Sequence, residues 1–326
     1  MFLEALEKVL AAHATGAAIR AVEAGPTADN VLWRGIEEAG FLALMLPEES
    51  GGAGLPLAEL FPILECLGRF GIPLPVAHSI VAGALAGARA ELPAGMVTLA
   101  TQLQRPAGGG LRCPQVPGGA VAGHVLVADG AQLLLLDCAQ AQRQPVGDPR
   151  GLVAHLNWAD ERTVWRLPEG GAALPAFAAA MTAALLSGAM QRVFDMALEQ
   201  CNTRVQFGKS IGKFQAMQQQ LSVMGEHVLA AAIAAECAFR SDGFLPGALA
   251  AAVAKSRTSE AVGVVASTAH AVQGAIGMTD EFDLGILTRR MHEWRTHYGA
   301  EQYWNQHIGA QVLASGGTLA DFVLAV

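Results

Sequence analysis

One segment of this 326-residue chain combines residue types that could bind a phosphorylated ligand. It runs from Arg204 to Gln215 and reads RVQFGKSIGKFQ. The arginine could hold a diphosphate through two parallel hydrogen bonds. An aromatic ring follows at Phe207, an amide ends the segment, and two glycines make the backbone adaptable. A plain loop between two long helices explains the same residues, and spacing alone does not separate the two interpretations.

Other motifs with known chemistry are incomplete. Gly208-Lys209-Ser210 resembles the end of a phosphate-binding loop, but Thr203 stands where that loop needs a glycine. No GxGxxG follows a strand-like run, so a Rossmann nucleotide site is not indicated. The histidines are scattered and show no metal-binding spacing such as HExxH, so no metal site is predicted.

Composition limits the class of protein. Apolar residues make up 52% of the chain and charged residues only 15%, against roughly 25% in an average soluble protein. This balance excludes a disordered chain and predicts extensive burial in a core or against a partner. The net charge is −8 without a long basic run, which argues against nucleic-acid binding. The five cysteines form no CxxC pair and fit free thiols in a cytoplasmic protein.

The chain divides into three regions with different sequence patterns, and these regions must position the residues of the Arg204–Gln215 segment. Residues 1–92 show helical spacing, residues 93–171 alternate short apolar runs with glycine and proline pairs, and residues 172–326 return to long helical segments. The apolar runs Val125–Val127 and Leu133–Leu136 are typical of strands. A helix with one buried face is predicted from apolar residues at three- and four-residue spacing, namely Phe214, Met217, Leu221, Met224, Val228 and Leu229.

The stretch from Gly170 to Gln191 carries no charge and is long enough to span a membrane. It is mostly alanine and contains Pro175, Thr182 and Ser187, whereas membrane helices carry more leucine, isoleucine and phenylalanine. We therefore expect a buried core helix and no membrane span. The first helical segment contains acidic residues, which argues against a signal peptide.

Three motifs, in the same order along the chain, resemble the acyl-CoA dehydrogenase family. RVQFGKSIGKFQAMQQQLSVM (204–224) is similar to the family segment between two long helices. VQGAIGMTDEF (272–282) is similar to its glycine-rich turn, and LWRGIEEAGFLALMLPEESGGAGL (32–55) to its N-terminal PEExGGxG segment. Family members are flavoenzymes with a helical N-terminal domain, a middle β domain and a C-terminal four-helix bundle. The resemblance therefore implies a mainly α protein with a small β domain between residues 93 and 171.

The resemblance implies that the cofactor is FAD, bound mainly to a neighbouring subunit. Arg204 and Phe207 would contact the diphosphate side of this FAD, and Gln215 would lie at the same interface. Such an arrangement requires an oligomer, either of this chain alone or with a larger homologous subunit.

The glycine-rich turn is implied to approach the ADP part of the cofactor. Gly274 and Gly277 would let the backbone come close where a side chain would block it. Gln273 would bind at the same turn, although the family usually has its glutamine two positions earlier, where this chain has Ala271.

Departures from the family pattern concern the reaction itself. The family removes the α-proton of an acyl-CoA with a glutamate while the β-hydride goes to the flavin. Tyr298 stands at the position of that glutamate, and a phenol with a pKa of ~10 is a poor base near neutral pH. Some members place the base on the first long helix of the bundle, where this chain has Ala178. Ala179 stands where many members have a substrate-binding arginine.

Glu301 is the nearest carboxylate to the vacant position. It is either a relocated base or an acid in the first turn of a helix, where the helix dipole favours it. The middle region also lacks the usual TEPxxGSD and WxT/S strings that surround the flavin ring. Trp294 and Trp304 are expected to pack in the core.

Three hypotheses remain open on the sequence. The chain is an FAD-dependent acyl-CoA dehydrogenase subunit whose larger partner supplies the base, a self-sufficient homo-oligomer with a relocated base, or a non-catalytic helical scaffold. The resemblance implies an acyl-CoA substrate for the first two, with an electron-transfer flavoprotein as electron acceptor.

Overall fold

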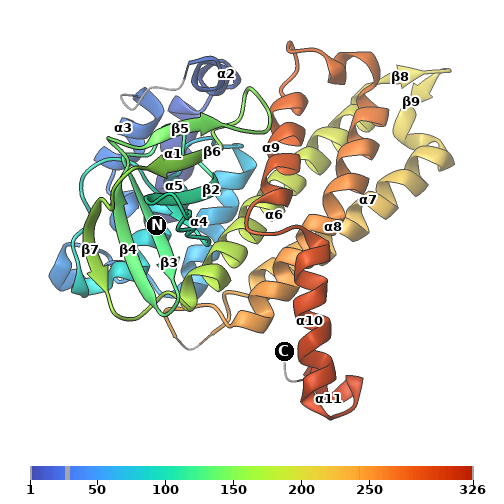
Figure 1. Cartoon of the computed structure of the whole chain (residues 1–326). Helices are drawn as coiled ribbons and strands as arrows, with labels where there is room; N and C mark the ends of the chain where they lie inside the picture. Colours follow the sequence, from blue (N-terminus) through green and yellow to red (C-terminus); the bar gives the residue numbers. More distant parts are fainter. Residues whose placement is uncertain (1, 26–29, 242, 325–326) are drawn as a thin grey trace.

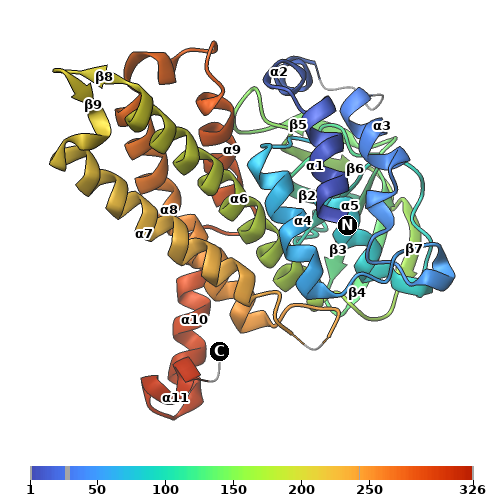
Figure 2. The ribbon, with the colours of Figure 1, turned by 180° about the vertical axis from the view of Figure 1, so that it is seen from behind.

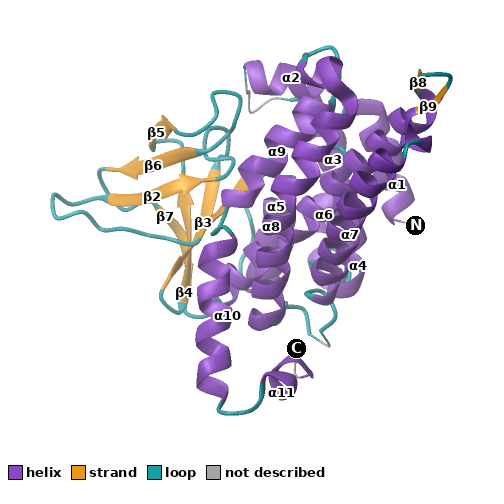
Figure 3. Ribbon diagram, turned by 90° about the vertical axis from the view of Figure 1, so that its right-hand side faces the viewer, coloured by secondary structure: helices purple, strands orange, loops and turns teal. Residues whose placement is uncertain are grey.

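The computed structural model describes residues 2–25, 30–241 and 243–324. Helices from both ends of the chain form one layer, and the strands of the middle region pack against them (Figure 1). Figure 2 shows the helices from behind, and Figure 3 shows the strands to one side of the helical layer. This arrangement confirms the predicted mainly α fold with a small middle β domain.

The N-terminal helices are short and share one apolar core. Thr15 and Asn30 begin the second and third helices, because their side chains accept hydrogen bonds from the backbone N–H groups of Ala18 and Leu32. The helices are α1 (Phe2–His13), α2 (Gly16–Ala24), α3 (Val31–Glu38), α4 (Leu57–Arg69) and α5 (Val76–Ala86), with 3-10 turns at Phe41–Ala43, Glu48–Ser50 and Gly87–Arg89.

Seven strands form two sheets in the middle region. They are β1 (Val97–Ala100), β2 (Leu111–Val116), β3 (His124–Asp129), β4 (Gln132–Asp137), β5 (Gln142–Pro145), β6 (Ala154–Trp158) and β7 (Thr163–Leu167). The sheet orders are β1-β3-β4-β7 and β2-β6-β5, and only β1 and β3 run parallel among these pairs.

The central strands β3 and β4 of the four-stranded sheet are buried on both faces, which confirms the predicted strands. Alternate residues of a strand point to opposite faces. Leu126, Leu133 and Leu135 join the helical core. Val125, Val127, Leu134 and Leu136 instead join a second core, together with Cys113, Leu156 and Trp158 of the other sheet. Burial on both sides explains the continuous apolar runs in β3 and β4.

The C-terminal half consists of long helices joined by short turns. The elements are α6 (Ala173–Thr203), β8 (Val205–Gln206), β9 (Lys209–Ser210), α7 (Gln215–Cys237), α8 (Ala248–Gln273), α9 (Leu284–Thr296), α10 (Glu301–Ser315) and α11 (Leu319–Leu324), with 3-10 turns at Ile211–Lys213 and Gly274–Met278. Helix α6 packs against α4, α7, α8 and α9 and so links the two helical groups. The domain limits at 92 and 171 stay predictions, although the elements change type near both.

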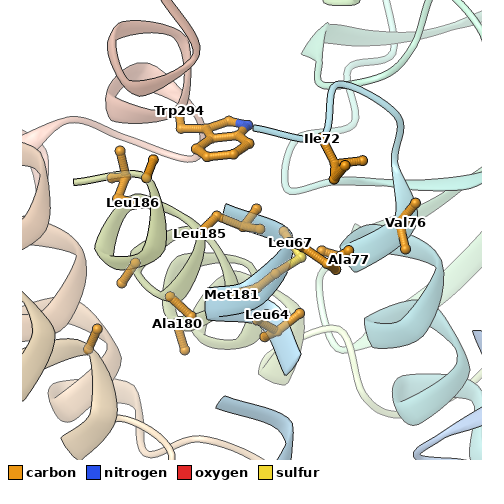
Figure 4. Packing of buried hydrophobic residues seen from close by; sticks show 14 of the residues in the cluster. Leu64, Leu67, Ile72, Val76, Ala77, Ala180, Met181, Leu185, Leu186 and Trp294 are labelled. Atoms are coloured by element: carbon orange, nitrogen blue, oxygen red, sulfur yellow. The ribbon is translucent and has the colours of Figure 1, made fainter. Parts of the chain in front are cut away.

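Helix α6 is the central core helix. In its most apolar 18-residue window, 89% of the residues are buried, against 44% for a similar window in Ala248–Met278. Both segments are long and apolar enough to cross a membrane, so the burial of α6 supports the core-helix interpretation. A Cβ added at Gly188 would overlap the carbonyl oxygen of Glu65, and one added at Gly68 would overlap that of Leu185. The backbones of α4 and α6 therefore touch, and large apolar side chains close around this crossing (Figure 4).

The predicted stripe on α7 is correct in part. Leu221, Met224 and Val228 are buried, but Leu229 is 62% exposed. Adjacent helical residues point about 100° apart, so a helix with a narrow buried face cannot bury both Val228 and Leu229.

Candidate active site

A cavity of about 670 Å³ lies between the β region and α9. Its walls come from the ends of β1 and β2, the loop between β5 and β6, the last turns of α8, the length of α9 and the segment that follows α9. The β5–β6 loop is tied to the segment before α9 by an exposed ion pair of 3.0 Å between Arg150 and Asp280.

Tyr298 lines this cavity at the position where the resemblance expects a glutamate. The chain turns sharply here, with φ of 56° at Tyr298 and 100° at Gly299. The phenol donates a hydrogen bond of 3.1 Å to the carbonyl oxygen of Leu99 at the end of β1. Burial raises the pKa of Tyr298 well above its usual value, so the phenol keeps its proton and is not a base.

Lys255 of α8 holds the same turn from the other side. Its side chain is fully buried, and Nζ donates hydrogen bonds to the carbonyl oxygens of Arg295 and Gly299, both at 2.9 Å. A third bond of 2.7 Å goes to Ser259 Oγ. Burial lowers the pKa of Lys255 to about 7, although the Glu301 carboxylate opposes this shift.

Two ionisable residues at the end of α9 line the cavity, namely Glu293 in its last turn and His297 directly after it. Glu293 Oε1 lies 3.6 Å from His297 Nε2, which is longer than a hydrogen bond. No described residue forms a hydrogen bond with His297 Nε2. Arg290 holds the second carboxylate oxygen of Glu293, and Arg290 is also bonded to Glu23 of α2 at 3.0 Å.

The pKa values of this pair move in opposite directions. Burial raises the pKa of Glu293, and the Arg290 guanidinium opposes this shift. Burial lowers the pKa of His297 well below its usual range, and His78 and Lys255 add to this effect. A neutral imidazole therefore lies beside a carboxylate of increased basicity.

Glu301 lies at the start of α10 and is bound to arginine. Its carboxylate accepts hydrogen bonds from Nε of Arg295, at 3.0 Å, and from Nη2. The bond with Arg295 lowers the pKa of Glu301 to about 2. Gly299 and Tyr303 line the cavity, whereas Glu301 is not part of its described lining. This geometry favours the helix-start interpretation, and a role for Glu301 as base stays a prediction.

The other positions discussed from the sequence are in the core. Ala178 and Ala179 are fully buried within α6. Trp294 and Trp304 are also buried, which confirms that they are packing residues.

Arg204, Phe207 and Gln215 lie around the β8–β9 hairpin, which projects from the end of the bundle (Figure 1). All three are exposed, and Phe207 is 90% exposed with φ of 52°. No hydrogen bond or ion pair among the described residues uses the Arg204 guanidinium. A Cβ added at Gly274 would lie 3.7 Å from Arg204 Nη1, so the arginine and the glycine-rich turn lie side by side.

Gln273 and Gly277 have roles inside the chain. The Gln273 side chain is buried, and its Nε2 donates a 3.1 Å hydrogen bond to the carbonyl oxygen of Met196 in α6. A Cβ added at Gly277 would lie 2.8 Å from Cβ of Gln273, so packing accounts for this glycine. Gly274 ends α8 with φ of 69°, a conformation that glycine adopts freely. Cofactor binding by Gln273 and Gly277 stays a prediction.

The described residues form neither a metal site nor the nucleophile site of a serine hydrolase. Within the described ranges, no group of histidine, cysteine, aspartate or glutamate side chains could hold a metal ion. The letters of Gly208–Gly212 match the GxSxG pattern of hydrolase nucleophiles. Ser210, however, ends a two-residue strand of an exposed hairpin, which is not the strand of a central sheet that a nucleophile elbow needs.

The sequence motifs do not single out Glu293 and His297. Residues four apart lie on one side of a helix, and His297 directly follows the last residue of α9, so this spacing is a signal that the sequence carries. It does not reveal that this face borders a cavity, because the opposite wall comes from the β5–β6 loop more than 140 positions away.

Comparisons with known proteins agree with this architecture. The profiles of the acyl-CoA dehydrogenase N-terminal and C-terminal domains match residues 1–90 and 176–313. The acyl-CoA dehydrogenase IpdE2 of Mycobacterium tuberculosis is 32% identical over 295 residues, which cover 90% of each chain. The acyl-CoA dehydrogenase FadE34 of the same organism is 30% identical over 91% of this chain and 45% of that protein.

Solved structures agree as well. A chain of the ChsE4-ChsE5 complex from Mycobacterium tuberculosis has a TM-score of 0.82 and 23% identity, with 97% of each chain covered. A variant of the Tcur3481-Tcur3483 steroid acyl-CoA dehydrogenase has a TM-score of 0.78 and 25% identity, with 97% of this chain and 98% of that chain covered. The chain therefore belongs to the acyl-CoA dehydrogenase family of FAD-dependent oxidoreductases.

Proposed function

We propose that this chain is one subunit of an enzyme that oxidises an acyl-CoA thioester to its α,β-unsaturated form, together with a larger homologous subunit. The observation that carries this proposal is the combination of two features in one chain. Beside the hairpin, the Arg204 guanidinium is exposed and has no partner among the described residues, and Tyr298 stands at the position where the resemblance expects the base. FAD, when bound, supplies the hydride acceptor for the β-carbon.

The residues around the hairpin fit an extended diphosphate. Arg204 would donate two parallel hydrogen bonds to it, since its guanidinium has no partner among the described residues. Within 4 Å, a Cβ added at Gly274 meets only that guanidinium, so the space beside the turn is open to a ligand. Phe207 would cover the diphosphate from one side, and Gln215 would lie at the subunit boundary.

Exposed apolar side chains near the hairpin support an oligomer. Contiguous apolar surface on a soluble protein marks an interaction site. These side chains are Val205, Phe207, Ile276 and Met278 at the hairpin end, and Val223, Leu229 and Ile233 along α7. The names of the ChsE4-ChsE5 and Tcur3481-Tcur3483 structures each pair two proteins, which supports a heteromer.

We propose that a partner subunit supplies the catalytic base. The three positions at which the family resemblance would place a base in this chain do not provide a free carboxylate. Tyr298 keeps its proton, Ala178 has no ionisable group, and Glu301 is held by Arg295. We further propose an electron-transfer flavoprotein as the electron acceptor and a cytoplasmic location.

Titration of the flavin-free oligomer with FAD tests the role of the hairpin. Arg204→Ala should weaken FAD binding about ten- to a hundredfold, because a charge-assisted contact worth roughly 1.5–3 kcal/mol is lost. Arg240→Ala is the control, since Arg240 is an exposed arginine beyond the opposite end of α7 and pairs with Glu236. Equal FAD affinity in the Arg204→Ala variant and the parent protein would overturn the assignment.

Co-expression tests the role of the partner. The chain alone should show little oxidation of acyl-CoA with an artificial electron acceptor, and activity should appear with a larger homologue that carries the base. Light scattering should give a mass above the 33.8 kDa of one chain. Full turnover by the purified chain would contradict the partner hypothesis.

A further inference from the structure

A second cavity, of about 530 Å³, lies between the N-terminal helices and the bundle. Its walls come from the α1–α2 junction, the start of α2, the end of α4, the second half of α6 and the start of α9. It shares no lining residue with the cavity beside the β region, and no residue of the three family motifs lines it. Its volume is within the range of roughly 300–1,000 Å³ that small-molecule sites have.

Most of the residues that line the second cavity are apolar. The larger ones are Ile19 of α2, Phe70 at the end of α4, Met196 of α6, and Ile286 and Leu287 of α9. All of these except Phe70 are at most 7% exposed. The apolar body of a ligand would therefore be sheltered from water against these side chains.

Two guanidinium groups also line the second cavity, Arg69 from α4 and Arg192 from α6. They lie on neighbouring parts of two touching helices. A Cβ added at Gly188 would be 2.9 Å from the backbone nitrogen of Arg69, and Arg192 follows Gly188 by about one helical turn. Nη2 of Arg69 donates a 3.1 Å hydrogen bond to Asp195, whereas no hydrogen bond or ion pair among the described residues uses the Arg192 guanidinium.

One positive charge at the second cavity has no counter-charge. Arg69 pairs with Asp195, and Arg20 of α2 pairs with the lining residue Asp283 at 2.8 Å, so Arg192 remains. A carboxylate carries a single negative charge near neutral pH, whereas a phosphate monoester carries about −1.5 to −2. The two oxygens of a carboxylate also match the parallel N–H groups of a guanidinium. The charge balance therefore favours a carboxylate over a phosphate.

The frame of the second cavity is built before a ligand binds. The start of α2 lies against α9, since a Cβ added at Gly16 would overlap the Asp283 carboxylate. Further along α2, Glu23 accepts a 3.0 Å hydrogen bond from the buried Arg290 of α9. On the other side, α4 and α6 touch at Gly188. A ligand therefore does not have to order these helices, and this lowers the cost of binding.

We propose that the second cavity binds a carboxylate with an apolar body. The carboxylate accepts hydrogen bonds from the guanidinium groups of Arg192 and Arg69, and the apolar body lies against Met196 and the first turn of α9. Binding is reversible and involves no bond making or breaking. It needs neither FAD nor a base from a partner, so this inference is independent of the proposed function.

Isothermal titration calorimetry of the purified full chain with octanoate tests the proposal. Arg192→Ala should weaken octanoate binding about ten- to a hundredfold, because a charge-assisted contact is lost. Octanamide, the neutral analogue, should bind the parent at least about tenfold more weakly than octanoate and should be insensitive to Arg192→Ala. Hexanoate should bind about fifteenfold more weakly than octanoate, since each CH2 removed from an apolar wall costs about fourfold in affinity.

Two further variants separate the charge from the geometry of the arginine. Arg192→Lys keeps the charge but loses the planar pair of donors, and it should retain part of the octanoate affinity. Arg162→Ala is the control, because it removes an exposed arginine from the β region, and it should bind octanoate like the parent.

Methyl NMR with isotope-labelled methionine locates the ligand. Octanoate should shift the signal of Met196, assigned with Met196→Leu, and should leave that of Met45 unchanged, because Met45 lines a different apolar cavity. Three results would each overturn the proposal: no octanoate binding by the parent, equal octanoate affinity in Arg192→Ala and the parent, or a shift of Met45 without one of Met196. FAD affinity and turnover are not read in these experiments, so this proposal and the proposed function fail separately.

Discussion

Lys255→Met should remove a pH-dependent part of the folding free energy. Burial lowers the pKa of Lys255 in the folded chain to about 7, against an ordinary value of 10.5. Between these values the unfolded chain binds more protons than the folded chain, so stability rises with pH through this window. From pH 6 to pH 8.5 the gain amounts to about 2 kcal/mol. Methionine has no proton to lose, and this gain should disappear.

Urea unfolding at pH 6 and pH 8.5 measures this difference. Both proteins are compared at the same concentration, because oligomers are stabilised by mass action. The upper limit of pH 8.5 avoids the buried thiols Cys66, Cys113 and Cys138, whose pKa values are raised to about 12 by burial. These thiols lower stability only above the usual thiol pKa of 9. Groups on which Lys255 does not act are shared by the two proteins and cancel in the comparison, and Lys255 only lowers further the already low pKa values of His297 and Glu301.

Lys255→Met should also lose a contribution to stability that does not depend on pH. It leaves the carbonyl oxygen of Gly299 without its donor, at a cost of roughly 1–3 kcal/mol. Lys8→Met is the control, because Lys8 is exposed and pairs only with Glu4. An identical pH dependence in Lys255→Met and the parent would refute the reasoning. It would mean that three oxygen acceptors hold the proton on the buried amine despite its burial.

Two further predictions concern stability. Burial lowers the pKa of His78 to about 4, and its ring nitrogens have no described hydrogen-bond partner, so stability should fall by about 2–3 kcal/mol from pH 7 to pH 4.5 as the unfolded chain takes up the proton. Thermal unfolding at both pH values should show that His78→Leu lacks this loss, and an unchanged loss would assign it to other groups. Gly188→Ala should destabilise the chain by about 1–3 kcal/mol in urea unfolding, because its Cβ overlaps the Glu65 carbonyl oxygen. Gly263→Ala at an exposed position of α8 meets nothing within 4 Å and should instead stabilise the chain by roughly 0.5–1 kcal/mol, so equal effects of the two substitutions would contradict the tight crossing.

The parts of the fold that the sequence predicts correctly are those with a clear local pattern of apolar residues. The runs Val125–Val127 and Leu133–Leu136 predict strands because a sheet buried on both faces needs continuous apolar sequence. The alanine-rich stretch of α6 predicts a core helix because small side chains allow close helix packing. Leu229 shows the limit of such patterns, since apolar spacing does not say which of two neighbouring residues faces the core.

The candidate site was predictable only where a motif is continuous in sequence. Arg204 and Gly274 belong to two motifs whose juxtaposition follows from the family resemblance, and the structure brings them together. The buried Gln273 side chain hydrogen-bonds to α6 inside the bundle, and residue type alone does not predict this direction. Glu293 gains its surroundings from distant segments, because Arg290 binds one oxygen and the β5–β6 loop covers the other.

The contact of α4 and α6 through Gly68 and Gly188 has a mechanical consequence. Two helices whose backbones touch cannot slide or tilt without steric overlap, so the N-terminal helices and the bundle move as one rigid body. Any widening of the cavity must therefore come from the opposite wall, where the exposed pair Arg150–Asp280 ties the β5–β6 loop to the helices. Exposed ion pairs are weak and are screened by salt. We therefore expect ionic strength to set how fast ligands enter and leave, while the helical frame stays unchanged.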